Sequence, residues 1–435
     1  MADRAQARAV KAWIWTRSTT EDRLMRLLVS GFSADPTQRL TPPRPNQALR
    51  WIALAFAFAS CCANSGTWDK AWPNEPAIEH RDFELRHRWL QAQDAEFQNQ
   101  VWQLDTKQSP TTFAPNPLPT QSAVDAREPE AAIFRIPVVV HVIHTGQSVG
   151  TGVNISDAQI HSAIDNLNAA YSNSDTAWSD YTGVNTLVQF CLAQRDDLNN
   201  PSPGIVRVDG SAVFQYTAQG ICNATGSCGV DNELAVKSLS AWDSTRYLNV
   251  WVVNEINGND GGAGTQGYAY FPGAPAAQDG LAVLYNAFGY DPDGSLGFNL
   301  KPFTSRNATS IHEIAHFLGV YHTYEGDGFG STCPTDAICG ASGDCVADTP
   351  RHRRSAMGCI DDATPNVCQV GTTAGDFQHN FMDSSSEVCQ SEFTSGQAQR
   401  MVSTLLNVGS RILLGASPGC EPVALPDPIL VDGFE

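Results

Sequence analysis

The sequence predicts an α+β fold, with strand patterns and two helical patterns that precede an irregular, cysteine-rich region. Three observations support this class. An apolar run at 136–143 has the pattern of a buried strand, and an amphipathic helical pattern follows at 156–172. A second helical pattern surrounds His312. Beyond residue 322 the chain is rich in Gly, Asp and Cys, until a capping-box pattern at 394–397 opens a C-terminal helix.

Residues 1–62 are predicted to form an N-terminal extension that ends in a signal-like segment. The apolar run at 51–60 is too short to span a bilayer, so we expect no integral membrane span. Ala57-Phe58-Ala59 fits an A-x-A cleavage site, which predicts secretion. Ala59-Ser60-Cys61 resembles a lipobox, and the alternative is therefore a lipid anchor at Cys61 on a bacterial cell envelope.

Residues 63–130 are polar, with a helical piece near 83–102 and a linker rich in Pro, Thr and Ser at 109–122. We interpret this segment as a pro-region or spacer. A domain at 131–415 and a short acidic tail at 416–435 follow.

Within the domain, further strands are predicted at 187–192, 247–253 and 281–285. The glycine-rich stretch at 261–273 carries Tyr268 and Tyr270 in alternation. It fits either an edge strand that faces a cleft or a flexible loop. Ser156 is expected to cap the helix at 156–172, and Thr304 or Ser305 is expected to begin the helix around His312.

The pattern HExxHxxGxxH at 312–322 carries the chemistry. On a helix, His312 and His316 project from one face, a spacing that suits two ligands of one small cation. Gly319 lets the chain turn, which brings His322 back as a third ligand. Three neutral imidazoles with an open position are typical of catalytic zinc, and Glu313 beside the first ligand is placed to act as general base.

The composition excludes one class of partner. With 27 Lys and Arg against 46 Asp and Glu, the formal net charge is −19, which argues against a nucleic-acid-binding surface. The acidic excess fits plain solubility, calcium binding or a preference for basic substrates, and composition does not separate these. We expect a monomer.

Twelve cysteines are present, ten of them between Cys191 and Cys420. No CxxC pair occurs, so a zinc ribbon is disfavoured and disulfides are expected. Proximity in sequence makes Cys222–Cys228 a plausible pair.

Several stretches resemble one protein family. The long histidine motif, the Met-turn-like Asn380-Phe381-Met382-Asp383, and the stretches 136–143, 155–160, 190–193, 343–350 and 393–397 are similar to the pappalysin (cytophagalysin) family of metzincin zinc metalloproteases. The resemblance implies a metzincin fold with a twisted mixed sheet, a backing helix at about 156–172 and an active-site helix. The same resemblance implies an irregular, disulfide-rich lower subdomain that holds Met382 and a C-terminal helix. It also implies a zinc endopeptidase whose protein or peptide substrates lie extended across a cleft and pair with an edge strand.

The resemblance carries further implications. The family binds calcium in its lower subdomain, where Asp344 and Thr349 match ligand positions of its GDxVxDTP stretch. Its disulfide arrangement implies the pairs Cys339–Cys368 and Cys359–Cys389.

One position departs from the family. Ser384 stands where the family carries a tyrosine that assists the transition state, and a serine hydroxyl is too short to span the same gap. This favours an alternative, a catalytically silent zinc- and calcium-binding surface protein. The sequence also leaves open a small-molecule amidase or esterase and a calcium-stabilised adhesion module. The intact Glu313 argues against a silent site, because a structural metal needs no base.

Overall fold

The computed structural model describes residues 133–423, except for 175–181, 224–227, 260–261, 263, 337–338, 341 and 356–357. The signal-like segment with Cys61, the pro-region and most of the acidic tail lie outside the described residues. No helix in the described part is both long and apolar enough to cross a membrane.

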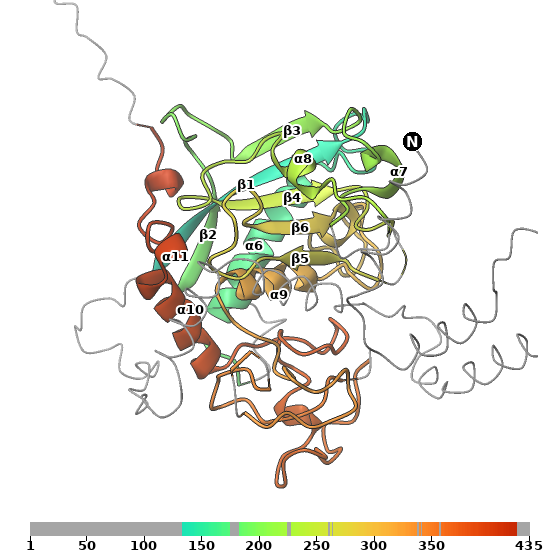
Figure 1. Ribbon diagram of the computed structural model, residues 1–435, viewed down its shortest axis with the longest axis vertical. Coiled ribbons are helices and arrows are strands. Elements are labelled where there is room, and N and C mark those ends of the chain that lie inside the picture. Colours follow the sequence, from blue (N-terminus) through green and yellow to red (C-terminus); the bar gives the residue numbers. More distant parts are fainter. Residues whose placement is uncertain are drawn as a thin grey trace, which may run out of the picture. The chain divides into compact units, whose positions relative to one another are not determined.

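A six-stranded sheet organises the described residues (Figure 1). Its path is β2-β1-β4-β6-β5, with β3 also paired to β1. All pairings are parallel except that of β5 with β6. The strands are β1 (Phe134–His144), β2 (Val188–Leu192), β3 (Ile205–Asp209), β4 (Leu248–Val253), β5 (Gly267–Ala269) and β6 (Leu281–Leu284).

Burial explains why the middle strands read as continuous apolar runs. Every residue of β4 and of β6 is buried, as expected for parallel strands covered on both faces. The expected strands at 136–143, 187–192, 247–253 and 281–285 are all confirmed. The glycine-rich stretch is an edge strand over Gly267–Ala269, and β3 is a strand that the sequence did not predict.

The backing helix is α6 (Asp157–Ser172). The Ser156 side chain accepts a hydrogen bond from the Gln159 amide, which confirms the expected cap. Its apolar stripe is buried and includes Tyr171, whose hydroxyl donates to the Ile311 carbonyl at 3.0 Å. This bond ties α6 to the next long helix.

That helix, α9 (Ala308–Phe317), begins later than Thr304 or Ser305, so the expected start is wrong. Asn307 has a left-handed backbone (φ 60°), which interrupts the helical path just before Ala308. Its side-chain amide donates to the Ala163 carbonyl of α6 at 3.0 Å. The Thr304 hydroxyl donates to the Asn286 carbonyl and does not cap α9.

The segment 318–393 consists mostly of loops and lies on the side of α9 away from the sheet (orange in Figure 1). The capping box of Thr394 and Gln397 is present and opens α10 (Ser395–Asn407). The short helices are α7 (Tyr216–Gln219), α8 (Glu233–Lys237), α11 (Gly409–Ile412), η2 (Tyr285–Ala287), η3 (Ala374–Asp376) and η4 (Pro418–Cys420).

Disulfides cross-link this segment and also join β2 to the C-terminal part of the described chain. The pairs among the described residues are Cys191–Cys420, Cys222–Cys228, Cys333–Cys368, Cys339–Cys345 and Cys359–Cys389. Cys222–Cys228 and Cys359–Cys389 agree with expectation. The pair Cys339–Cys368 is wrong, because Cys339 bonds Cys345 six residues on, while Cys333 takes Cys368.

Candidate active site

Three histidine side chains converge at the C-terminal end of α9. His312 and His316 lie one turn apart on the helix, and Gly319 (φ 86°) turns the chain so that His322 returns to them. The Nε2 atom of His322 lies 3.1 Å from that of His316 and 3.1 Å from that of His312. In the described part of the chain this is the one group of three or more His, Cys, Asp or Glu that could hold a metal ion.

The hydrogen bonds of these rings prepare their nitrogens for a cation. His312 Nδ1 lies 2.6 Å from the Phe381 carbonyl, and His316 Nδ1 lies 2.7 Å from the Val320 carbonyl. A carbonyl only accepts, so both Nδ1 atoms carry the proton and both Nε2 atoms present a lone pair. Burial lowers the pKa of His312 to about 4, which keeps that imidazole neutral at neutral pH.

The donor set therefore fits a metal. Nitrogen lone pairs that face one another at this distance lack hydrogen-bond donors for all of them, whereas one cation can accept all three lone pairs. Tetrahedral zinc with Zn–N bonds of about 2.0–2.1 Å places its nitrogens roughly 3.3 Å apart, close to the spacing found here. The three side chains are almost fully buried, which shields such an ion from bulk water.

Glu313 follows the first histidine on α9. Its Oε2 atom accepts the amide of Ala269 at 3.0 Å, and the side chain is buried. Burial raises the pKa of Glu313 to about 8, while the Ala269 hydrogen bond acts in the opposite direction. A cation held by the neighbouring histidines would favour the carboxylate and lower that pKa.

Strand β5 supplies this amide from the free edge of the sheet. The bonds from Leu284 N to Gln266 O and from Tyr270 N to Gly280 O run towards β6. The amide of Ala269 lies on the opposite edge, towards α9. Gly267 permits this close approach, because a Cβ there would lie 2.9 Å from Thr309 Cγ2.

The loop around Met382 is bonded to both ends of the histidine motif. Met382 is fully buried, and its carbonyl accepts the amide of Thr323, next to His322, at 3.2 Å. The preceding carbonyl, that of Phe381, holds His312. The Ser384 hydroxyl donates to the Ser355 carbonyl at 2.8 Å.

Asp344 and Thr349, the expected calcium ligands, lie together. The Thr349 hydroxyl donates to Asp344 Oδ2 at 2.6 Å, and the Val346 amide donates to Oδ1 at 3.1 Å. Burial raises the pKa of Asp344 to about 7. Calcium at this loop stays a prediction.

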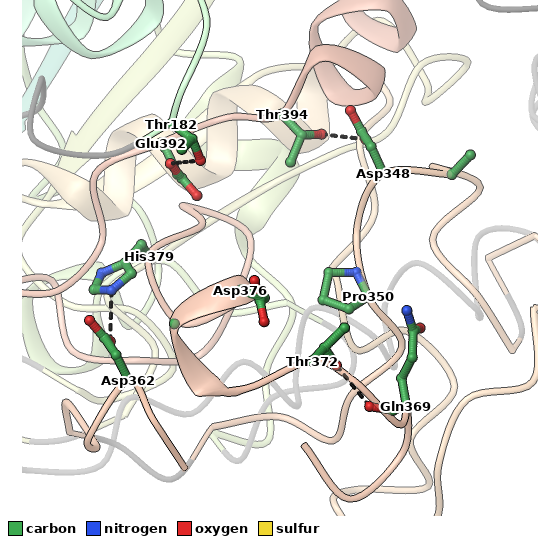
Figure 2. Close-up of a pocket in the computed structure, with 12 residues that line it drawn as sticks. Thr182, Asp348, Pro350, Asp362, Gln369, Thr372, Asp376, His379, Glu392 and Thr394 are labelled. Atoms are coloured by element: carbon green, nitrogen blue, oxygen red, sulfur yellow. Dashed lines mark hydrogen bonds and ion pairs between the residues drawn. The ribbon is translucent and has the colours of Figure 1, made fainter. Parts of the chain in front are cut away.

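An acidic pocket of about 480 Å³ lies beside this loop (Figure 2). His379 faces Asp362 at 2.9 Å, and Asp348 accepts the Thr394 hydroxyl at 2.8 Å. Asp376 and Glu392 also line it, whereas neither Glu313 nor the three clustered histidines do. The pocket is therefore separate from the candidate active site.

Comparison with known proteins decides the family. The family model described as Peptidase_M43, pregnancy-associated plasma protein-A, matches residues 231–406. An extracellular metalloprotease of Pyricularia oryzae is 30% identical over 275 residues, which cover 62% of this chain and 74% of that protein. This chain belongs to the pappalysin family. A further relative, an extracellular metalloprotease of Sordaria macrospora, is 28% identical over 62% of this chain and 75% of its own length.

Among solved structures, mature mirolysin of Tannerella forsythia in complex with a cleaved peptide resembles this pappalysin. The TM-score is 0.53 with 29% identity, and the match covers 68% of this chain and all of the mirolysin chain. The family prediction from sequence and the metzincin fold are thus confirmed. The protein is a metalloendopeptidase, and its match to the family spans the whole histidine motif.

Proposed function

We propose that this pappalysin is an exported, zinc-dependent endopeptidase with His312, His316 and His322 as metal ligands and Glu313 as general base. The observation that carries the proposal is the convergence of three buried imidazole Nε2 atoms at 3.1 Å. Two of these rings are oriented by carbonyls that fix the proton on Nδ1. Neutral, oriented imidazoles are the form that binds zinc.

The proposed reaction combines the chemistry of a bound metal with proton transfer by Glu313. Bound zinc would supply Lewis-acid chemistry, polarising the scissile carbonyl and making water more acidic. The Ala269 amide holds Glu313 Oε2, which directs the other carboxylate oxygen to take a proton from the attacking water. Glu313 then returns that proton to the leaving amine. Burial of the carboxylate excludes competing solvent from this exchange.

The substrate is proposed to be a protein or peptide in extended form. β5 is the end strand of the sheet path and pairs with β6 on one side, so we place the substrate strand along its other side, where the Ala269 amide meets Glu313. The related mirolysin structure holds a cleaved peptide, which supports this substrate class. We propose 131–415 as the catalytic domain, 416–435 as an acidic tail and 63–130 as a pro-region or spacer.

Export is supported by the extracellular relatives, and it fits the five disulfides among the described residues. We also propose calcium at Asp344 and Thr349 and a monomeric state, with a lipid anchor at Cys61 as the alternative to free secretion.

Metal analysis with a digestion assay tests the proposal. The exported, oxidised chain should contain one zinc per molecule and digest denatured casein. Removal of zinc by a chelator should stop digestion, and added zinc should restore it. A chain that stays active after complete zinc removal would show that the proposal is wrong.

A further inference from the structure

A buried, charged cluster lies behind the edge strand. Glu233 and Lys237, one turn apart on α8, form an ion pair of 2.8 Å, and both side chains are fully buried. The Tyr268 hydroxyl donates to Glu233 at 3.0 Å, and the Tyr270 hydroxyl lies 2.7 Å from both of its carboxylate oxygens. Lys237 Nζ donates to the Gln278 carbonyl at 2.7 Å.

The aromatic rings complete the enclosure of the ammonium group. Lys237 Nζ lies 4.6 Å from the centroid of the Tyr270 ring, 5.0 Å from that of Tyr268 and 4.8 Å from that of Trp251. Burying two charges in this way is costly, and apolar residues of similar volume often stabilise a fold equally well. The presence of a buried, fully hydrogen-bonded ion pair is therefore better explained by the strand that it holds rigidly than by added stability.

What the cluster contacts is the shortest and least supported strand of the sheet. β5 has three residues and pairs with β6 on one edge. The two tyrosines flank Ala269 in sequence, so their side chains lie on the face opposite to the Ala269 side chain. The Ala269 amide donates to Glu313 at 3.0 Å. The hydrogen bonds of Tyr268 and Tyr270 to Glu233 therefore fix the chain on both sides of Ala269, and with it the position at which the Ala269 amide meets the Glu313 carboxylate.

We propose that Glu233, Lys237, Tyr268 and Tyr270 are positioning residues that hold β5 at the depth where the Ala269 amide orients Glu313. This inference rests on the proposed role of Glu313. Removing one tyrosine hydroxyl should let β5 shift without removing any group that touches the substrate. A misplacement below 1 Å is enough to slow catalysis roughly 10-fold.

The test compares Tyr270→Phe with Tyr216→Phe in the full-length exported chain. Tyr216 is a matched control, because it is also fully buried and its hydroxyl donates to the Ile143 carbonyl of β1, a strand that β4 and β6 separate from β5. With labelled denatured casein and kcat normalised to the measured zinc content, we expect kcat of Tyr270→Phe to fall about 10-fold. The KM should change less than about twofold. Tyr216→Phe should keep kcat within about twofold of the parent.

Hydrogen exchange gives a readout that does not depend on activity. The Ala269 amide should exchange faster in Tyr270→Phe than in the parent or in Tyr216→Phe. An unchanged kcat and unchanged exchange in Tyr270→Phe would overturn the inference, as would an equal loss of kcat in the control. Tyr268→Phe carries the same expectation should Tyr270→Phe fail to fold.

Glu313→Gln separates this inference from the proposed function. If Glu313→Gln still digests casein, the role of Glu313 is wrong, and the exchange rates still show whether the cluster holds β5. If Glu313→Gln is inactive but Tyr270→Phe behaves like the parent, the cluster has no positioning role and the proposed function stands.

Discussion

The sheet layer and the loop segment 318–393 both contribute to the active site, but different forces hold them. The sheet layer depends on apolar burial and strand ladders, and it supports α9 with His312, Glu313 and His316. The loop segment depends on disulfides and on bonds between side chains and backbone, such as Asn380 Oδ1 to the Met382 amide. It supplies His322 and the carbonyl that orients His312. The site is therefore assembled from a part held by strand ladders and apolar burial, and a part that adds cross-links to the residues it contributes to the same core.

The largest effect is expected from loss of one ligand in either region. His316→Ala on α9 and His322→Ala in the loop should each lose bound zinc and reduce casein digestion by on the order of 10³-fold or more, because an open three-histidine site needs all its ligands. His161→Ala, an exposed residue of α6, is the control and should retain zinc and activity. A variant of either ligand that keeps both would refute the assembly described here.

Removing one disulfide from each region sharpens the contrast. Replacing Cys191 and Cys420 by serine opens a link across 229 residues and should lower the free energy of unfolding by about 5 kcal/mol. Replacing Cys359 and Cys389, 30 residues apart, should cost about 3–4 kcal/mol. Only the second pair lies beside the Met382 loop, so only its loss should weaken zinc binding in the folded protein. Equal zinc affinities of the two disulfide variants, measured by competition with a chelator, would argue against a special role of the Cys359–Cys389 link in supporting the zinc site.

Two buried groups, one in each region, should respond to pH with opposite sign. In the sheet, burial lowers the pKa of His141 from 6.5 to about 4, so the unfolded chain binds more protons between these values. Stability is then lost as pH falls, by up to about 3 kcal/mol. In the loop segment, burial raises the pKa of Asp344 from 3.8 to about 7, so stability is lost as pH rises through this window, by about 4 kcal/mol.

Urea unfolding of the chelated protein between pH 4 and 7.5 measures both slopes. His141→Asn should remove the loss at low pH, and Asp344→Asn should remove the loss at high pH. If both variants change the slope in the same direction, the assignment of these pKa shifts is wrong.

The smallest effect is expected at Ser384. Its hydroxyl is bound to the Ser355 carbonyl, so Ser384→Ala should cost about 1 kcal/mol of stability and leave kcat within about threefold of the parent. A loss of kcat by 100-fold or more would mean that this serine takes part in the reaction after all.

Much of this arrangement could be predicted from the sequence. The helical spacing of His312 and His316, the turn at Gly319 and the cap at Ser156 depend on local patterns, and the structure has them where expected. The start of α9 was missed because Asn307 takes a left-handed conformation stabilised by a bond to distant Ala163. Strand β3 was missed because its residues are only half-buried and give a weak apolar signal.

The groups that orient the site were beyond sequence reasoning. The Phe381 and Val320 carbonyls and the Ala269 amide are backbone atoms, which any residue type would supply. Glu233 and Lys237 have the i, i+4 spacing of an ordinary surface pair, and only the packing of β5 reveals that they are buried. The partner of Cys339 depended on the path of an irregular loop, which no periodicity encodes.

The central claim, that three histidines hold zinc while Glu313 moves the proton, is tested most directly by Glu313→Gln. The side chain keeps its size and its place beside Ala269, so zinc content should remain one per chain. Casein digestion should fall by on the order of 10²–10⁴-fold, the contribution of a general base. Digestion at the parental rate with zinc in place would contradict the mechanism.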